Sequence, residues 1–158
     1  MIIRKYETAD KTKTTKYLES AWPNTPIKTT LNKLTSQMVE TEGNRTLILD
    51  DNGDIKGVGI WVDKGPLPTP CIAYLSVTPF NLSTYMRMVY EIIKDSQKEG
   101  YSEGYVPLYD KSLVELLKTQ WAGLDIKPVG IDVETNEPST WVLFIKYDDA
   151  LAKLEKVI

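Results

Sequence analysis

The residues TLILDDNGDIKGVGIWVDKG (46–65), CIAYLSVTP (71–79) and FNLSTYMRMVYEIIKDSQKEG (80–100) decide how this chain folds. In the first segment the Asn52-Gly53 pair separates two apolar runs. Both residues accept the positive φ angles of a type I′ turn. This segment therefore predicts a β-hairpin with its turn at Asn52-Gly53.

The second and third segments predict a strand that leads almost directly into a helix. The run from Cys71 to Val77 is apolar enough to lie inside a sheet, and Asn81 is a suitable N-cap for the helix that follows it. Apolar residues recur along that helix with the period of a buried stripe. They are Leu82, Tyr85, Met86, Val89, Ile92 and Ile93. Because a helix N-terminus directs several N–H groups at one point, we expect an anion site there, with phosphate as the usual anion.

The remaining segments extend this core in both directions. Pro107 interrupts one short strand and indicates a sheet edge or an early strand end. The resulting order, β-α-α-β-β-β-α-β-α-β-β, predicts an α/β fold with one mixed sheet and helices on both faces. The expected strands are 2–6, 105–109, 125–133 and 141–147, and the expected helices are 11–22, one beginning at Thr30, 111–121 and a short one within 149–158.

The composition limits the classes of function. The chain has 158 residues, which fits a single domain over residues 1–158, and its net charge of −3 gives no electrostatic case for general nucleic-acid binding. It contains one cysteine, no signal-peptide pattern and no apolar run near the roughly 20 residues that span a bilayer, so we expect a cytoplasmic protein without a membrane association. Histidine is absent, which excludes histidine bases, triads and metal ligands.

The hairpin, the strand AYLSVTP that enters a helix, and the final strand WVLFIKY with its charged tail together resemble the GNAT superfamily of acyl-CoA-dependent N-acyltransferases. The resemblance implies a GNAT-like central sheet in which the strand ending at Val77 separates from its parallel neighbour. It further implies that acetyl-CoA is the cosubstrate. The backbone of Leu75, Ser76 and Val77 would contact its pantetheine arm. The residues implied at the phosphates are Asn81, Leu82, Ser83, Thr84 and Arg87.

The sequence departs from the GNAT pattern at two points. The family's phosphate loop contains glycines and a basic or amide residue, whereas the interval from Thr78 to Asn81 has neither a glycine nor a basic residue. The family also often carries a tyrosine in the later helix, where this chain has Leu117. The first departure matters because glycines allow the backbone to approach a pyrophosphate closely.

Two candidate catalytic residues follow the short strand near Pro107. Tyr109 is a candidate acid, and Asp110 is a candidate base or amine ligand. Edge packing is the alternative for Tyr109, and helix capping is the alternative for Asp110. Capping is likewise the alternative for Asn81, and a solvated helix position is the alternative for Arg87. No metal site is expected.

These observations leave three functional hypotheses. The first is an acetyl-CoA-dependent N-acetyltransferase in which a small-molecule or peptide amine attacks the thioester directly. The second is a catalytically inactive GNAT-fold protein that binds a protein or peptide. The third is an unrelated α+β domain. Each hypothesis leaves open whether the protein forms a homodimer.

Overall fold

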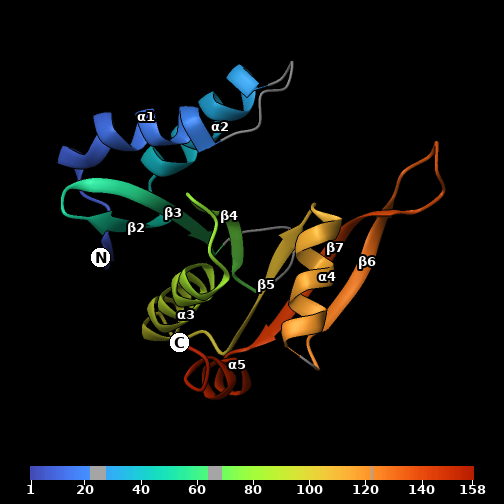
Figure 1. The fold of residues 1–158 in the computed structure, drawn as a ribbon. Coiled ribbons are helices and arrows are strands. Elements are labelled where there is room, and N and C mark those ends of the chain that lie inside the picture. Colours follow the sequence, from blue (N-terminus) through green and yellow to red (C-terminus); the bar gives the residue numbers. More distant parts are fainter. Residues whose placement is uncertain (22–27, 64–68, 122) are drawn as a thin grey trace.

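The computed structural model describes residues 1–21, 28–63, 69–121 and 123–158. Figure 1 shows a central sheet with helices on both of its faces. The described strands are β1 (Ile2–Lys5), β2 (Arg45–Asp51), β3 (Asp54–Val62), β4 (Cys71–Val77), β5 (Glu103–Leu108), β6 (Asp125–Ile131) and β7 (Pro138–Lys146). The described helices are the 3₁₀ turn η1 (Thr8–Asp10), α1 (Lys11–Ala21), α2 (Lys28–Glu40), α3 (Leu82–Lys98), α4 (Lys111–Gln120) and α5 (Tyr147–Leu154).

The sheet is mixed, as the sequence predicts. Its strand order is β1-β2-β3-β4-β5-β7-β6. Every neighbouring pair is antiparallel except β4 and β5, which are parallel and are connected by α3. A parallel pair needs such a crossover because its two strands run in the same direction.

The two faces of the sheet carry separate hydrophobic clusters. On one face, Leu18 of α1 and Val39 of α2 pack against Val58 and Ile60 of β3. On the other face, α3, α4 and α5 contribute to one larger cluster with the opposite side chains of the strands. Figure 1 shows α1 and α2 on one side of the sheet, with α3 and α5 on the other.

The Asn52-Gly53 turn joins β2 to β3. The two φ angles are 53° and 92°, as a type I′ turn requires. The Asp50 carboxylate accepts a hydrogen bond from Gly53 N at 2.8 Å, and Lys13 Nζ donates to the Gly53 carbonyl at 2.6 Å. The hairpin predicted from the sequence is therefore confirmed.

Gly59 of β3 allows α3 to lie close against the sheet. A Cβ atom at this position would be 2.8 Å from Ile92 Cδ1 and 3.3 Å from the terminal methyl group of Met88. Relief of crowding therefore explains this glycine. The observed buried face of α3 contains Tyr85, Met86, Val89, Ile92 and Ile93, with Leu82 half-buried, which confirms the predicted stripe.

Some element boundaries differ from those expected. Trp22, the expected end of the first helix, lies outside the described residues. β6 ends at Ile131 and not at Val133, because the chain turns through a bend that places Asn136 at a φ of 58°. Tyr109 lies beyond the end of β5, so it is not a strand residue.

Pro107 lies in β5, which is an interior strand in the sheet order, so the expected sheet edge is wrong. The other alternative, an early strand end, agrees with the structure, because β5 ends at Leu108. The pairing explains why this proline is tolerated. Tyr105 N donates to the Pro70 carbonyl at 3.0 Å, on the β4 side of the strand. Two residues later, the nitrogen of Pro107 faces the same side because strand geometry repeats every second residue. β4 and β5 have no paired residues at that level, so no N–H is needed there.

Candidate active site

The parallel strands β4 and β5 separate soon after they meet. Among the described residues their ladder consists of one pair, Cys71 with Tyr105. The rest of β4, from Ile72 to Val77, stays paired with β3 on the opposite side except at Ala73. In such a ladder every second residue of β4 directs its N–H and C=O away from β3. These groups therefore have no ladder partner in β5, and this separation of the two strands, which we call the opening, is the one that the sequence analysis expected.

A bulge in β4 determines which side chains face each side of the sheet. Tyr74 pairs with Ile60 and Ile72 pairs with Trp61, so Ala73 has no opposite residue in β3. An extra residue of this kind bends a strand and increases its twist. Beyond the bulge, Tyr74 packs toward the α1 side and Leu75 toward the α3 side.

The predicted pantetheine-contacting residues lie along the opening. Leu75, Ser76 and Val77 pair with Gly59, Val58 and Gly57 of β3. Leu75 and Ser76 are half-buried, and Val77 is buried. All three residues thus lie on the strand that borders the opening, and the groups that the prediction concerns are their backbone N–H and C=O groups.

The N-terminus of α3 supplies N–H groups close to the end of β4. The Asn81 side chain accepts a hydrogen bond from Thr84 N at 3.0 Å, which confirms Asn81 as the N-cap and occupies the N–H of Thr84. Tyr85 N is bonded to the Asn81 carbonyl at 2.9 Å. Within the described residues, the N–H groups of Leu82 and Ser83 have no hydrogen-bond acceptor. These two donors are therefore available to an anion.

Two aromatic rings lie near this helix end. Phe80 and Tyr85 have ring centroids 5.8 Å apart with an angle of 53° between the planes. Phe80 is 52% exposed, whereas Tyr85 is buried. Tyr85 extends inward and lines a pocket under α3, so the pair links the helix end to the interior.

A chain of hydroxyl groups lies on the face of β4 that is turned toward α1. Tyr74 donates to Ser76 Oγ at 2.9 Å, and the Tyr17 hydroxyl lies 2.9 Å from Ser76 Oγ and 3.2 Å from Thr78 Oγ1. Tyr17 comes from α1 and is buried. Sequence reasoning did not find this group. The only signal was the spacing of Tyr74 and Ser76, which places them on one face of a strand.

The ionisable groups near the opening stay in their neutral forms around pH 7. Burial raises the pKa of Tyr74 and of Tyr85 to about 12. Burial also raises the pKa of the Cys71 thiol. Both phenols consequently act as hydrogen-bond donors and not as bases, and Cys71 is a poor nucleophile.

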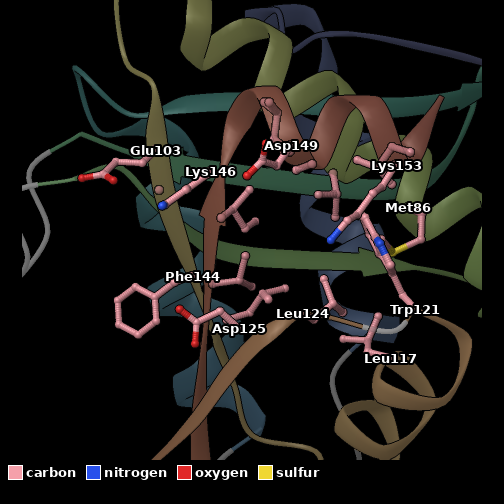
Figure 2. A pocket seen from close by; sticks show the side chains of 18 of the residues that line it. Met86, Glu103, Leu117, Trp121, Leu124, Asp125, Phe144, Lys146, Asp149 and Lys153 are labelled. Carbon is pink, nitrogen blue, oxygen red and sulfur yellow. The ribbon is translucent and has the colours of Figure 1, made fainter.

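One pocket has a volume of about 610 Å³. It lies on the α3 side of the sheet, between α3, α4 and α5 and above β5 and β7. Figure 2 shows Met86 near Trp121, with Leu117 and Leu124 below them. Its apolar wall is formed by Tyr85, Met86, Val89, Val106, Leu117 and Leu143, among others.

The predicted catalytic residues lie outside this pocket. Tyr109 follows β5 and is 74% exposed. The Asp110 carboxylate accepts hydrogen bonds from Ser112 N at 2.9 Å and Leu113 N at 3.4 Å, so it caps α4. Arg87 is exposed on α3. None of the ten predicted site residues is among those that line the pocket.

None of the helices in the described part of the chain has the length and hydrophobicity needed to span a membrane. No group of three acidic or cysteine ligands suited to a metal ion occurs among the described residues either.

Comparison with solved structures identifies the fold. An acetyltransferase of the GNAT family from Streptococcus pneumoniae matches with a TM-score of 0.62 and 13% identity, over 92% of this chain and 98% of that one. The ribosomal-protein-S18-alanine N-acetyltransferase from Escherichia coli matches with a TM-score of 0.65 and 14% identity, over 92% and 93%. The aminoglycoside 6′-N-acetyltransferase from Enterococcus faecium gives 0.62 and 14%, over 91% and 94%.

The likeness is one of structure. No protein-family model matches the sequence, and no curated protein sequence matches it. The seven described strands, their order and the helices that connect them nevertheless define the acyl-CoA N-acyltransferase fold of the GNAT superfamily. The fold expected from the sequence is confirmed.

Proposed function

We propose that this protein is an acyl-CoA-dependent N-acyltransferase that transfers an acetyl group from acetyl-CoA to an amine. The observation that carries this proposal is the separation of β4 from β5 beside the open end of α3. One pair of residues joins the two strands, and two free N–H groups, those of Leu82 and Ser83, lie at the helix end. The similarity to solved acetyltransferases supports it.

The available groups fit an acyl-CoA at this opening. The exposed backbone edge of β4 can pair with the amide groups of a pantetheine arm in the manner of an added strand. The N–H groups of Leu82 and Ser83 can bind a phosphate, and the partial positive charge of the α3 N-terminus favours that anion. The missing glycines limit how closely the backbone can approach a pyrophosphate, but these two N–H groups remain.

The chemistry requires only positioning and charge stabilisation. The amine nitrogen attacks the thioester carbonyl carbon, the C–N bond forms, and the C–S bond breaks to release the thiolate. N–H groups of β4 at the opening stabilise the negative charge on the carbonyl oxygen. The amine enters as the free base, and the proton that it loses balances the thiolate.

We assign Tyr109 as the candidate donor of a proton to the leaving thiolate, because it directly follows β5 and is 74% exposed. Asp110 is the weaker candidate for a base. Its carboxylate already accepts two backbone hydrogen bonds as the cap of α4, and those bonds favour a structural role.

A second candidate function is a binding protein for a peptide or another protein, without catalysis. Two observations favour it. The segment from Thr78 to Asn81 lacks the glycines of a phosphate loop, and Leu117 is a buried wall residue at a position where the family often has a tyrosine.

Calorimetric titration with CoA and acetyl-CoA separates these candidates. The transferase proposal predicts saturable binding of both ligands, and then release of free thiol from acetyl-CoA when amines are added. No binding at millimolar ligand would rule it out. The second candidate predicts that absence of CoA binding, and release of thiol with any amine would exclude it.

The matched variants Leu82→Pro and Leu82→Ala test the helix end itself. Both remove the leucine side chain, but only the proline removes the N–H, and proline is well tolerated at the first position of a helix. Because a hydrogen bond to a charged group contributes about 1.5–3 kcal/mol, we expect Leu82→Pro to bind CoA at least about tenfold more weakly than Leu82→Ala. Equal affinities would show that this N–H does not contact the ligand.

A further inference from the structure

The pocket between α3, α4 and α5 extends along the whole length of β5. It is lined by both ends of β5, from Glu103 to Leu108, and by the facing residues of β7. A six-residue strand spans roughly 17 Å at 3.4 Å per residue. With a volume of about 610 Å³, the pocket is therefore long and narrow enough to suit a linear molecule.

The interior of this pocket offers few partners to polar groups. Apart from the hydroxyl groups of Thr69 and Tyr85 and the indole N–H of Trp121, the uncharged lining side chains carry no hydrogen-bonding group, and the charged lining residues are all exposed. A polar ligand group placed between those walls would lose its water without replacement. The part of a ligand that enters the pocket must therefore be a hydrocarbon. The charged lining residues are Glu103, Asp125, Lys127, Lys146, Asp149 and Lys153.

The charges at the rim differ in how far they are already neutralised. Lys127 Nζ lies 3.7 Å from an Asp125 carboxylate oxygen. Glu103 and Lys146 are directly opposite each other in the β5–β7 ladder, so an opposite charge lies on the strand beside Lys146, although the two groups form no ion pair within 4.0 Å. Lys153 takes part in no ion pair among the described residues.

Lys153 projects from α5 and lines the pocket, as does Trp121 at the end of α4 (Figure 2). Asp149, which also lines the pocket, lies one helical turn earlier on α5. Lys153 is thus the cation at the rim that an anionic ligand group can engage, and Asp149 is the charge that opposes it.

From this combination we infer that the pocket is a binding site for a linear fatty carboxylate, with the alkyl chain along β5 and the carboxylate at Lys153. The pocket shares β5 with the opening between β4 and β5, but no residue of β4 lines it, so it does not include the backbone edge of β4.

Titration of the full chain with octanoate, decanoate and dodecanoate tests whether the alkyl chain binds in the pocket. Each carboxylate is kept below its critical micelle concentration. Burial of one methylene contributes enough free energy for about a fourfold change in affinity. We expect affinity to rise by about this factor per methylene. An affinity that does not depend on chain length overturns the inference. These titrations contain no CoA, so their failure leaves the transferase proposal intact.

Variants of α5 test the assignment of the carboxylate. Lys153→Met should weaken decanoate binding about two- to fivefold and leave binding of the neutral 1-decanol unchanged. Asp149→Asn should strengthen decanoate binding about twofold. Lys156→Met is the matched control, since this exposed lysine lies outside the pocket lining, and it should change neither ligand. An equal effect of Lys153→Met on decanoate and decanol overturns the role of Lys153.

Two substitutions in the pocket wall test whether this pocket is the binding site. Two are used because either one alone could impair folding. Val106→Phe should fill the floor of the pocket and reduce binding of dodecanoate at least tenfold. Leu117→Ala should enlarge it and shift the preference toward longer chains. Thermal unfolding shows whether each variant is folded. If folded variants of both kinds bind all three carboxylates as the wild type does, the pocket is not the site.

Discussion

Arg4 joins three elements at the start of the sheet. Its guanidinium donates to both carboxylate oxygens of Asp10, at 2.7 and 2.8 Å, and to Asp50 at 3.0 Å. Asp10 is buried and also accepts a hydrogen bond from Glu7 N at 2.8 Å. The hydrogen bonds from Arg4 lower the pKa of Asp10 from 3.8 to about 2. The same contacts raise the pKa of Arg4.

The Arg4–Asp10 pair should make stability depend on acid pH. Because the pKa of Asp10 is lower in the folded state, its contribution is full above pH 3.8 and is lost as the pH falls through about 2. A shift of this size corresponds to at most roughly 2 kcal/mol. Urea unfolding of the wild type and Asp10→Asn at several pH values measures it. The stability gap should be largest above pH 5 and shrink toward pH 2; a gap that is constant over this range would contradict the assignment.

Several single residues were predictable from the sequence because their roles are local. The Asn52-Gly53 turn and the Asn81 cap depend on neighbours within four residues. The hydroxyl chain was not predictable, because Tyr17 and Ser76 lie 59 positions apart and meet only after α1 packs on β4. The free N–H groups of Leu82 and Ser83 follow from the helix start itself.

At the scale of elements, the contact of α3 with β3 depends on the absence of a side chain at Gly59. Gly59→Ala should lower the free energy of unfolding by about 1–3 kcal/mol, because the new methyl group would collide with Ile92 Cδ1 at 2.8 Å. Ile92→Val removes that Cδ1 atom. The double variant should therefore be more stable than the sum of the two single effects predicts. Denaturant unfolding of all four proteins checks this, and strict additivity would show that the two sites do not touch.

Pro107 shows how far the position of a strand in the sheet can be predicted from its sequence. Of the two alternatives that the sequence left open, the position at the sheet edge was wrong, whereas the strand does end early, at Leu108. The missing N–H faces the opening inside the sheet, where β4 has already left β5. A proline in an otherwise apolar strand thus had two explanations, and only the pairing of the neighbouring strand distinguishes them.

At the scale of the whole molecule, the order of elements was sufficient to predict the fold. Periodicity gave the strands and helices, and parallel pairing followed from the helix between β4 and β5. The pocket could not be predicted in this way. Its volume depends on how far α4 and α5 stand from β5 and β7, which is a property of packing between distant segments and not of any local pattern.

The central claim is that the opening beside β4 and the N-terminus of α3 bind an acyl-CoA. The most direct measurement is an NMR titration of backbone amide signals with CoA. The largest shifts should occur in residues 75–77 of β4 and in Leu82 and Ser83. Saturation with no shift in these residues, or with shifts confined to the turn between β6 and β7, would contradict the claim.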